Sequence, residues 1–313
     1  MLGVFTAARM PRNAMLSAFV DHTAVMLSAD TGFFGPDTEL WRVLCERTVV
    51  MGGLRALLMH AAHPLVAAAT AESGMYERDP VRRHERTLRL TFTLIFGGRQ
   101  EAAEAAAQIN VAHRSVHGID KRTGLAYDAR DPELLLWVHA SLVSSFLLFE
   151  RLTIGRLDDR GRQQFHEEAI RMAGLLGLPA SCAPERLEDL SSWIDATIGS
   201  GILQPTPSSR TLLGIVRGRE GGAPDYRSRA VGFMALHSLP APLRDLYEVD
   251  HSRADDRRLA ALGGALKVSR LVLPPKARYI GPAICAYARL RGETASVAQA
   301  EVLPQRWRER DAQ

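Results

Sequence analysis

Two arginines and a threonine lie on a helix face that otherwise carries apolar residues. Arg83, Arg86 and Thr87 are spaced three and four residues apart along the chain, and the same stripe continues with Leu90 and Leu94. This spacing places all five side chains on one face of a helix. A guanidinium that enters an apolar interior needs an anion or other acceptors, because an unpaired buried charge is very costly. The alternative is a solvated first helical turn.

Two histidines, His113 and His139, also lie on apolar helix faces. A lone histidine in such a place is more often a hydrogen-bonded core residue than a metal ligand. Two of them on helices that pack in one core favour a ligand site more strongly. His113 and His117 are four residues apart, a spacing that can hold one metal ion. The simpler interpretation of His117 is a solvated helix end that interacts favourably with the helix dipole.

Helix start and stop signals surround these residues. Asp79-Pro80 and Asp131-Pro132 each combine an N-cap residue with a proline at the first helical position, and this pattern predicts helix starts. The first helix carries the two arginines and the last carries His139. Between them we expect a helix over 100–117 that carries His113 and ends at Gly118.

The pair His63-Pro64 predicts a helix break, since a proline disfavours α geometry in the residue before it. His60 and His63 either line a cavity at this break or cap it. Residues 199–229 carry several Gly, Pro and Ser residues, and we expect a long loop there in which 211–216 form at most a helical turn. No sustained period-two alternation and no internal repeat occur, so an all-α fold is the economical prediction.

The chain of 313 residues is 46% hydrophobic, which is enough for one large helical domain. We expect a partly helical N-terminal extension over 1–32, a helical domain over 33–292 and a polar tail over 293–313. Lysine and arginine exceed the acidic residues by only four (39 minus 35), and they are dispersed. Aromatic residues make up 6% and do not alternate with basic ones, so a nucleic-acid partner is disfavoured.

Several other classes lose support from what the sequence lacks. The three cysteines are far apart, which fits neither a disulfide framework nor a thiolate metal site. The N-terminus shows no signal-peptide pattern, and we expect a cytoplasmic protein. The apolar stretches 56–71 and 134–149 are shorter than the ~20 residues of a membrane span, so we expect buried core helices.

Motifs of the common catalytic classes are missing too. The sequence contains no phosphate-binding loop, no strand-linked GxGxxG, no GxSxG and no HExxH motif. Glu248 and His251 form a single ExxH, whereas a di-iron carboxylate bundle needs two such pairs and two further carboxylates. A di-iron site is therefore weakly supported.

Taken together, the remaining motifs resemble one family of oxygenases, the MpaB-type family, whose distant relatives are the latex-clearing rubber oxygenases. The resemblance extends over about residues 33–292. It rests on HP at 63–64 after an apolar helix, DP at 79–80 followed by RHERT at 83–87, VAHRSVHG at 111–118, DPELLLWVHA at 131–140, LPAPLR from 239 and LPPKAR from 273.

The resemblance implies an all-helical protein with a globin-like core around haem b, which cleaves a carbon–carbon double bond oxidatively with O2. By position, His113 matches the axial histidine of the rubber oxygenases, and Arg83, Arg86 and Thr87 match their distal motif. His139 matches a second shared histidine, which is either the ligand itself or a partner that fixes the imidazole tautomer. The resemblance adds His63 to the same cofactor pocket.

One departure from the rubber oxygenases concerns Arg86, which stands where those enzymes have lysine. A guanidinium stays protonated and cannot coordinate iron as a neutral amine does, so a closed, lysine-capped resting state is not expected here. Arg86 is instead suited to donate hydrogen bonds to oxygen species or to bind a carboxylate or phosphate of the substrate.

The leading hypothesis is a haem b-dependent oxygenase in which His113 is the iron ligand. Its partners would be O2, an apolar isoprenoid- or lipid-like substrate and an electron donor of unknown identity. One alternative is a haem-binding sensor or carrier without turnover. Another is a non-haem metal enzyme that uses His113, His117 and a carboxylate. The sequence leaves open the substrate, the cleavage position, the choice between His113 and His139 as ligand, and the oligomeric state.

Overall fold

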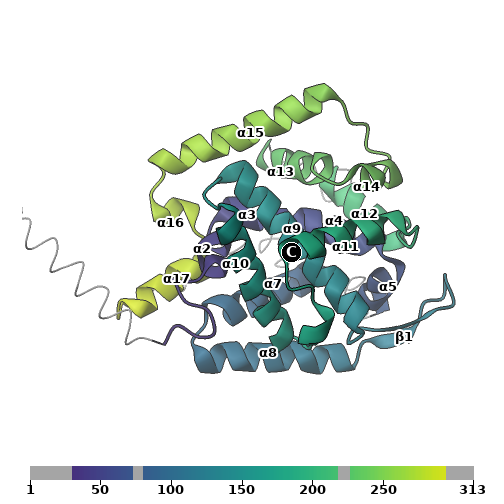
Figure 1. Ribbon diagram of the computed structural model, residues 1–313, viewed down its shortest axis with the longest axis horizontal. Helices are drawn as coiled ribbons and strands as arrows, with labels where there is room; N and C mark the ends of the chain where they lie inside the picture. Colours follow the sequence, from purple (N-terminus) through teal and green to yellow (C-terminus); the bar gives the residue numbers. More distant parts are fainter. Residues whose placement is uncertain (1–29, 73–79, 218–225, 294–313) are drawn as a thin grey trace, which may run out of the picture.

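The computed structural model describes residues 30–72, 80–217 and 226–293 (Figure 1). In these ranges the chain is helical apart from one small antiparallel sheet, so the all-α prediction is confirmed. The elements of the first half are α2 (Glu39–Leu44), α3 (Arg47–Val50), α4 (Gly52–Ala62), α5 (Pro64–Glu72), α7 (Pro80–Phe96), α8 (Arg99–Arg114), β1 (His117–Ile119), β2 (Ala126–Asp128) and α9 (Pro132–Thr153).

The second half of the chain is helical as well. Its elements are α10 (Asp159–Leu175), the 3₁₀ helix η1 (Ala180–Cys182), α11 (Leu187–Gly199), α12 (Pro207–Val216), α13 (Tyr226–His237), α14 (Ala241–Leu246), α15 (Arg253–Val272), α16 (Pro275–Arg278) and α17 (Gly281–Leu290). Figure 1 shows α9 near the middle, with α15 along the top of the view and α8 along the bottom. Helices α3, α4, α10, α11 and α15 all pack against α9.

Helix α9 organises the core because all of its residues except Pro132, Glu133 and Arg151 are buried or partly buried. It begins as the sequence predicts, since Asp131 accepts a hydrogen bond from the Glu133 backbone N–H at 2.8 Å and Pro132 is the first helical residue. Its 22 residues are longer than the apolar stretch 134–149, so the helix is long and apolar enough to cross a membrane by length and composition. More than half of its most apolar window is buried inside the protein, as in a core helix.

The break at His63-Pro64 separates α4 from α5 as predicted. His63 has extended backbone angles (φ −83°, ψ 117°), and the segments before and after it meet at 102°. A proline at the start of α5 forces this geometry on the preceding residue. The break turns the His63 side chain into the core, where the residue is only 5% exposed.

Helices α7 and α8 form a hairpin with a tight turn at Gly97 and Gly98. A Cβ on Gly97 would lie 2.5 Å from the Thr93 carbonyl oxygen, so the backbone leaves no room for a side chain there. A Cβ on Gly98 would lie 2.5 Å from Asp30 Oδ2 and would displace that carboxylate. Glu101 Oε2 accepts a hydrogen bond from the Gly98 backbone N–H at 2.9 Å and caps the start of α8. Asp79, the predicted cap of α7, lies outside the described residues.

Two details of the sequence prediction were wrong. Helix α8 ends at Arg114 rather than at 117, because His117–Ile119 pairs with Ala126–Asp128 as a two-stranded ribbon whose turn includes Gly124 at φ 72°. The predicted loop over 199–229 contains a ten-residue helix, α12. Its Thr206 N-cap also donates to the Ala61 carbonyl at 2.7 Å, so a contact distant in sequence supports the helix.

Candidate functional site

The C-terminal end of α4 is bound to α9 beside the predicted site histidines. His60 Nε2 lies 3.2 Å from the Val138 carbonyl oxygen, and Trp137 Nε1 donates to the Met59 carbonyl at 3.3 Å. The Trp137 ring lies 6.2 Å from the His63 ring and 6.3 Å from that of Trp193. His60 and His63 therefore belong to a packed aromatic and apolar region rather than to a solvated helix end.

His139 faces a histidine that the sequence analysis did not select. Its ring centroid lies 6.2 Å from that of His166 on α10, and both residues are buried. His166 Nε2 pairs with the Pro184 carbonyl at 2.8 Å. His139 Nε2 and His166 Nδ1, by contrast, are buried with no hydrogen-bond partner among the described residues. Burial lowers the pKa of His139 to about 4 and also lowers that of His166, so both rings are neutral at pH 7.

His113 lies near the C-terminal end of α8, on the side of the helix that carries the buried Ala102, Ala105 and Ala106. The residue is half-buried, while its Nδ1 atom is fully buried and has no hydrogen-bond partner in the described part of the chain. Burial lowers the pKa of His113, and the nearby Asp128 carboxylate opposes this only in part. The imidazole is therefore neutral at pH 7, which is the form that binds metals.

The predicted distal residues lie on the neighbouring helix. Leu90 and Leu94 of α7 are buried as expected, whereas Arg86 and Thr87 are exposed; the side chain of Arg83 lies outside the described part. Helices α7 and α8 pack against each other. The helix that carries Arg86 and Thr87 therefore neighbours the helix that carries His113.

The described residues do not bring all six predicted site residues into one contact set. The His63 ring lies against Trp137. His139 is two residues further along α9, and its ring faces His166 instead. His63, like His113, has a buried Nδ1 without a partner, and burial lowers its pKa to about 4. What unites His63, His113 and His139 is therefore chemistry: each is a neutral imidazole with a free ring nitrogen turned into the protein.

The non-haem metal site suggested for His113 and His117 finds no support in the described residues. His117 is exposed on strand β1, and its strand partner Asp128 is bound by Arg130 at 2.6 Å. A grouping of metal-capable side chains does occur elsewhere, at His237, His251 and Asp255. The ExxH pair Glu248 and His251 contributes only its histidine to this group.

A cavity of about 380 Å³ lies on the other half of α9 and was not predicted. Its lining includes Arg55, Arg151 and Arg162 together with Leu190 and Ile194, and no acidic residue. Arg55 is buried, and among the described residues it donates to neutral acceptors: the Ser238 carbonyl at 3.0 Å, the Ser145 hydroxyl at 2.8 Å and the Ser144 hydroxyl at 3.3 Å. Burial lowers its pKa to about 10. Arg162 is already paired with Asp159, so Arg55 and Arg151 are the guanidiniums beside these apolar walls that can hold an anionic group.

The sequence does contain signals for Arg55 and His166, which the sequence analysis did not identify as site residues. Arg55 is a single charge inside the apolar run GGLRALLMHAA. His166 is spaced three and four residues from Ala169 and Ile170 on an amphipathic helix. Neither signal reveals the partner, because the contacts with Ser238 and His139 join residues far apart in the chain.

Comparison with known proteins gives the family. The family described as "ER-bound oxygenase mpaB/B'/Rubber oxygenase, catalytic domain" matches residues 41–268. An uncharacterized protein of Mycobacterium bovis (Mb2261) and one of Mycobacterium tuberculosis (Rv2237) are each 24% identical over 220 residues, which covers 68% of this chain and 83% of the relative. No solved structure gives a significant match. The match spans well over half of the chain, which therefore belongs to the family of mpaB-type and rubber oxygenase catalytic domains.

Proposed function

We propose that the protein is a haem b-dependent oxygenase that cleaves a carbon–carbon double bond of an apolar, isoprenoid- or lipid-like substrate with O2. Membership of the oxygenase family supports the reaction class. The observation that carries the cofactor assignment is the buried, unpartnered Nδ1 of His113 on a neutral ring. A buried polar atom is normally hydrogen-bonded, so an unpartnered one indicates a missing ligand or a functional role.

The donor chemistry of these residues fits haem. A proximal histidine must be neutral, and apolar surroundings keep His113, His139 and His63 in that form. We assign the iron bond to His113 and place His139 and His63 in the surrounding pocket, where their rings position the ligand helix and the cofactor. Bound haem would supply the iron at which O2 is activated.

The residues of α7 would supply hydrogen-bond donors to oxygen that is activated at the cofactor. Arg86 carries a permanent charge and several N–H donors, and Thr87 adds a hydroxyl; both side chains are exposed on α7, next to the helix of His113. Donors fixed on a helix stabilise negative charge as it develops on oxygen without having to reorganise. Arg83 lies three residues before Arg86 and four before Thr87, so its spacing assigns it to the same helix face.

Balanced chemistry requires one O2 for each double bond cleaved, with both oxygen atoms appearing in two carbonyl products. The test is to load the full chain with haem b, reduce it chemically, and measure O2 uptake and carbonyl products with an isoprenoid alkene. The matched control is the saturated analogue of the same length. We expect uptake and products with the alkene alone.

Arg86→Gln separates the proposed enzyme from a carrier. We expect this variant to retain haem while the rate of product formation falls by about 10²–10³-fold, the usual cost of losing one preorganised donor. Two results would contradict the proposal. Equal O2 uptake with the saturated analogue would show that the alkene is not the target, and haem binding without any product would favour the carrier.

A further inference from the structure

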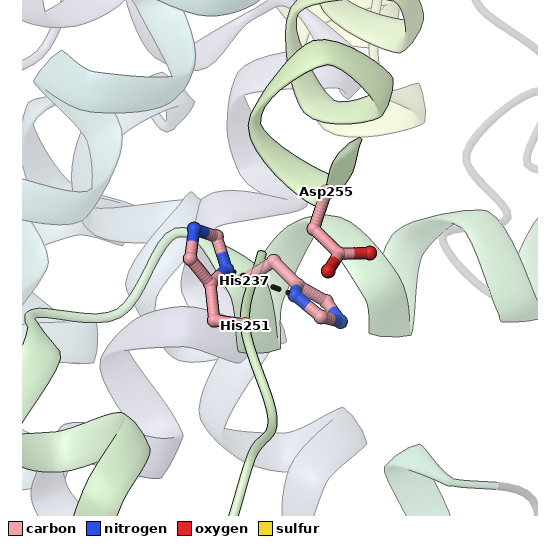
Figure 2. Close-up of side chains that lie close together, drawn as sticks. All are labelled: His237, His251 and Asp255. Carbon is pink, nitrogen blue, oxygen red and sulfur yellow. Dashed lines mark hydrogen bonds between the residues drawn. The ribbon is translucent and has the colours of Figure 1, made fainter. Parts of the chain in front are cut away.

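Two histidines and an aspartate meet at the junction of α13, α14 and α15, away from the proposed haem residues (Figure 2). His237 is the last residue of α13, His251 lies in the segment after α14, and Asp255 is in the first turn of α15. Each offers one ligand atom, and these atoms all lie within 4.8 Å of one another. The three residues are half-buried, so the group is shielded yet open to an ion from solvent.

We propose that His237, His251 and Asp255 form a Zn²⁺ site in which water is the fourth ligand. The two Nδ1 atoms of the histidines lie 3.1 Å apart. Two nitrogens that bind one tetrahedral zinc ion at ~2.05 Å lie about 3.3 Å from each other. The rings therefore already have nearly the separation that a shared metal ion requires.

The hydrogen bonds of His251 leave one of its ring nitrogens suited to bind a metal. Its Nε2 lies 2.9 Å from Asp256 Oδ1 and donates to that carboxylate, which leaves the lone pair of Nδ1 facing His237. Metal-binding histidines commonly donate their other ring N–H to a carboxylate in this way. Without metal, one proton bridges the two Nδ1 atoms. Zn²⁺ would take the place of that proton at Nδ1, and His237 would take up a proton from solvent at Nε2 in exchange, so its ring stays neutral and no net proton is released.

The other two ligands are held in place as well. The His237 ring stacks on Phe233 with centroids 4.2 Å apart, and the Arg258 guanidinium covers the Phe233 ring at 4.3 Å. Asp255 Oδ2 accepts hydrogen bonds from the Ser252 backbone N–H at 2.9 Å and its hydroxyl at 2.7 Å. Among the described residues Oδ1 accepts none, so this oxygen is available to a metal.

The backbone turn that precedes His251 is also constrained. Glu248 has a positive φ of 50°, which is uncommon outside glycine. Arg217 Nη2 fixes this turn by donating to the carbonyls of Tyr247 at 2.8 Å and Glu248 at 3.1 Å. A strained turn held by the side chain of the residue that follows α12 indicates that the position of the following segment matters.

A metal here would join the start of α15 to the end of α13. Helix α15 is largely exposed, and its one buried residue is Gly263, where a Cβ would lie 2.6 Å from the Leu152 carbonyl of α9. Few side chains hold this helix, so a metal clip at its first turn would add much to its attachment. Two imidazoles and one carboxylate favour zinc over magnesium or calcium, which prefer oxygen ligands.

The test is zinc titration of the untagged full chain after treatment with a chelator, with a chromophoric zinc indicator as competitor. We expect one tight site per chain and a higher melting temperature with zinc. In Asp255→Asn the amide oxygen still accepts the Ser252 hydrogen bonds but is a poor ligand, so zinc binding should be lost while circular dichroism stays unchanged. Asp256→Asn should weaken zinc binding by about 10–100-fold.

Two controls locate the site. His117→Ala removes an exposed histidine, and His113→Ala removes the proposed haem ligand; both should bind zinc as the unmodified chain does. Co²⁺ should give visible absorption bands typical of tetrahedral coordination, and His251→Gln should abolish them. The proposal is overturned if the unmodified chain binds no zinc, or if zinc binding survives Asp255→Asn and His251→Gln but is lost in His113→Ala. The proposed oxygenase function is unaffected by either result.

Discussion

The two histidine groups of this protein differ in how their ring nitrogens are satisfied. His139 and His166 face each other in the core, and each keeps one buried nitrogen that has no hydrogen-bond partner in the part of the chain that the structure describes. His237 and His251 lie at the rim, where they are hydrogen-bonded to each other and to Asp256. Burial is the main influence on the pKa of both histidines in the first group, whereas two carboxylates, Asp255 and Asp256, lie beside the second group.

The difference indicates which ligand each group suits. A neutral imidazole in apolar surroundings cannot by itself balance the charge of a divalent ion, whereas a large apolar cofactor brings both its own charge balance and its own packing surface. Carboxylates beside a histidine pair supply negative charge for a small hydrated cation. The following predictions test this contrast, from the largest expected effect to the smallest.

Trp137→Ala should have the largest effect on stability. Trp137 is 1% exposed and packs between His63 and Trp193, and its indole N–H donates to Met59. Removing it creates a cavity at the junction of α4 and α9, so we expect a loss of about 3–5 kcal/mol in the free energy of unfolding. Urea denaturation would measure this. Trp137→Phe, which keeps a ring, should lose clearly less; equal losses would argue against packing as the cause.

Acid should destabilise the core through its neutral histidines. Burial lowers the pKa of His60 from 6.5 to about 4, although its hydrogen bond with the Val138 carbonyl opposes the shift. Between these pH values the unfolded chain takes up a proton that the folded chain does not. His60 alone should therefore remove on the order of 3 kcal/mol of stability as the pH falls from 6.5 to 4.

The matched variant for this pH effect is His60→Gln, whose amide still donates to the Val138 carbonyl. Its stability should fall less steeply over the same pH range, as followed by denaturation at a series of pH values. His63 and His139 have pKa values of about 4 as well, so part of the slope should remain. An unchanged slope would show that His60 is not neutral in the folded chain.

His251→Ala should have a modest effect without metal. The side chain is 14% exposed and forms hydrogen bonds with His237 and Asp256. Losing such partly solvated bonds should lower the free energy of unfolding by about 1 kcal/mol. With saturating zinc, the difference between this variant and the unmodified chain should increase. If the two differ equally with and without zinc, the rim histidines are structural only.

Arg86→Ala should have the smallest effect on stability. The side chain is exposed on α7, so the free energy of unfolding should change by no more than about 0.5 kcal/mol. Thermal denaturation would measure this change. The same variant should lose much of the oxygenase activity of the haem-loaded protein, as proposed for Arg86→Gln. A large loss of stability would show instead that Arg86 is part of the core packing.

Local signals in the sequence predicted most helix starts and breaks. The elements that were predicted wrongly depend on contacts between residues distant in the chain. The caps at Asp131 and the break at Pro64 depend on neighbouring residues, and both were predicted correctly. Helix α12 was taken for a loop because its support includes the bond from Thr206 to the Ala61 carbonyl. The end of α8 was misplaced because the ribbon partner of His117 is Asp128, beyond a turn.

The same distinction applies to the candidate sites. Periodicity identified His113 and His139 as inward-facing, and the structure places both at least partly in the interior. It could not show that His139 faces His166, nor that His237 and His251 meet, because fourteen positions and a tight turn separate the latter pair. For Arg86 and Thr87, periodicity left open an inward-facing position or a solvated first helical turn, and the described structure leaves both side chains exposed.

The most direct test of the central claim is the absorbance spectrum of the chain after incubation with haem b and removal of the excess. The unmodified chain, His113→Ala, His139→Ala and His117→Ala would be compared under identical conditions. We predict a Soret band of bound haem in the unmodified chain and in His117→Ala, and its loss in His113→Ala. Retention in His113→Ala together with loss in His139→Ala would contradict the ligand assignment, and no band in the unmodified chain would contradict the haem proposal itself.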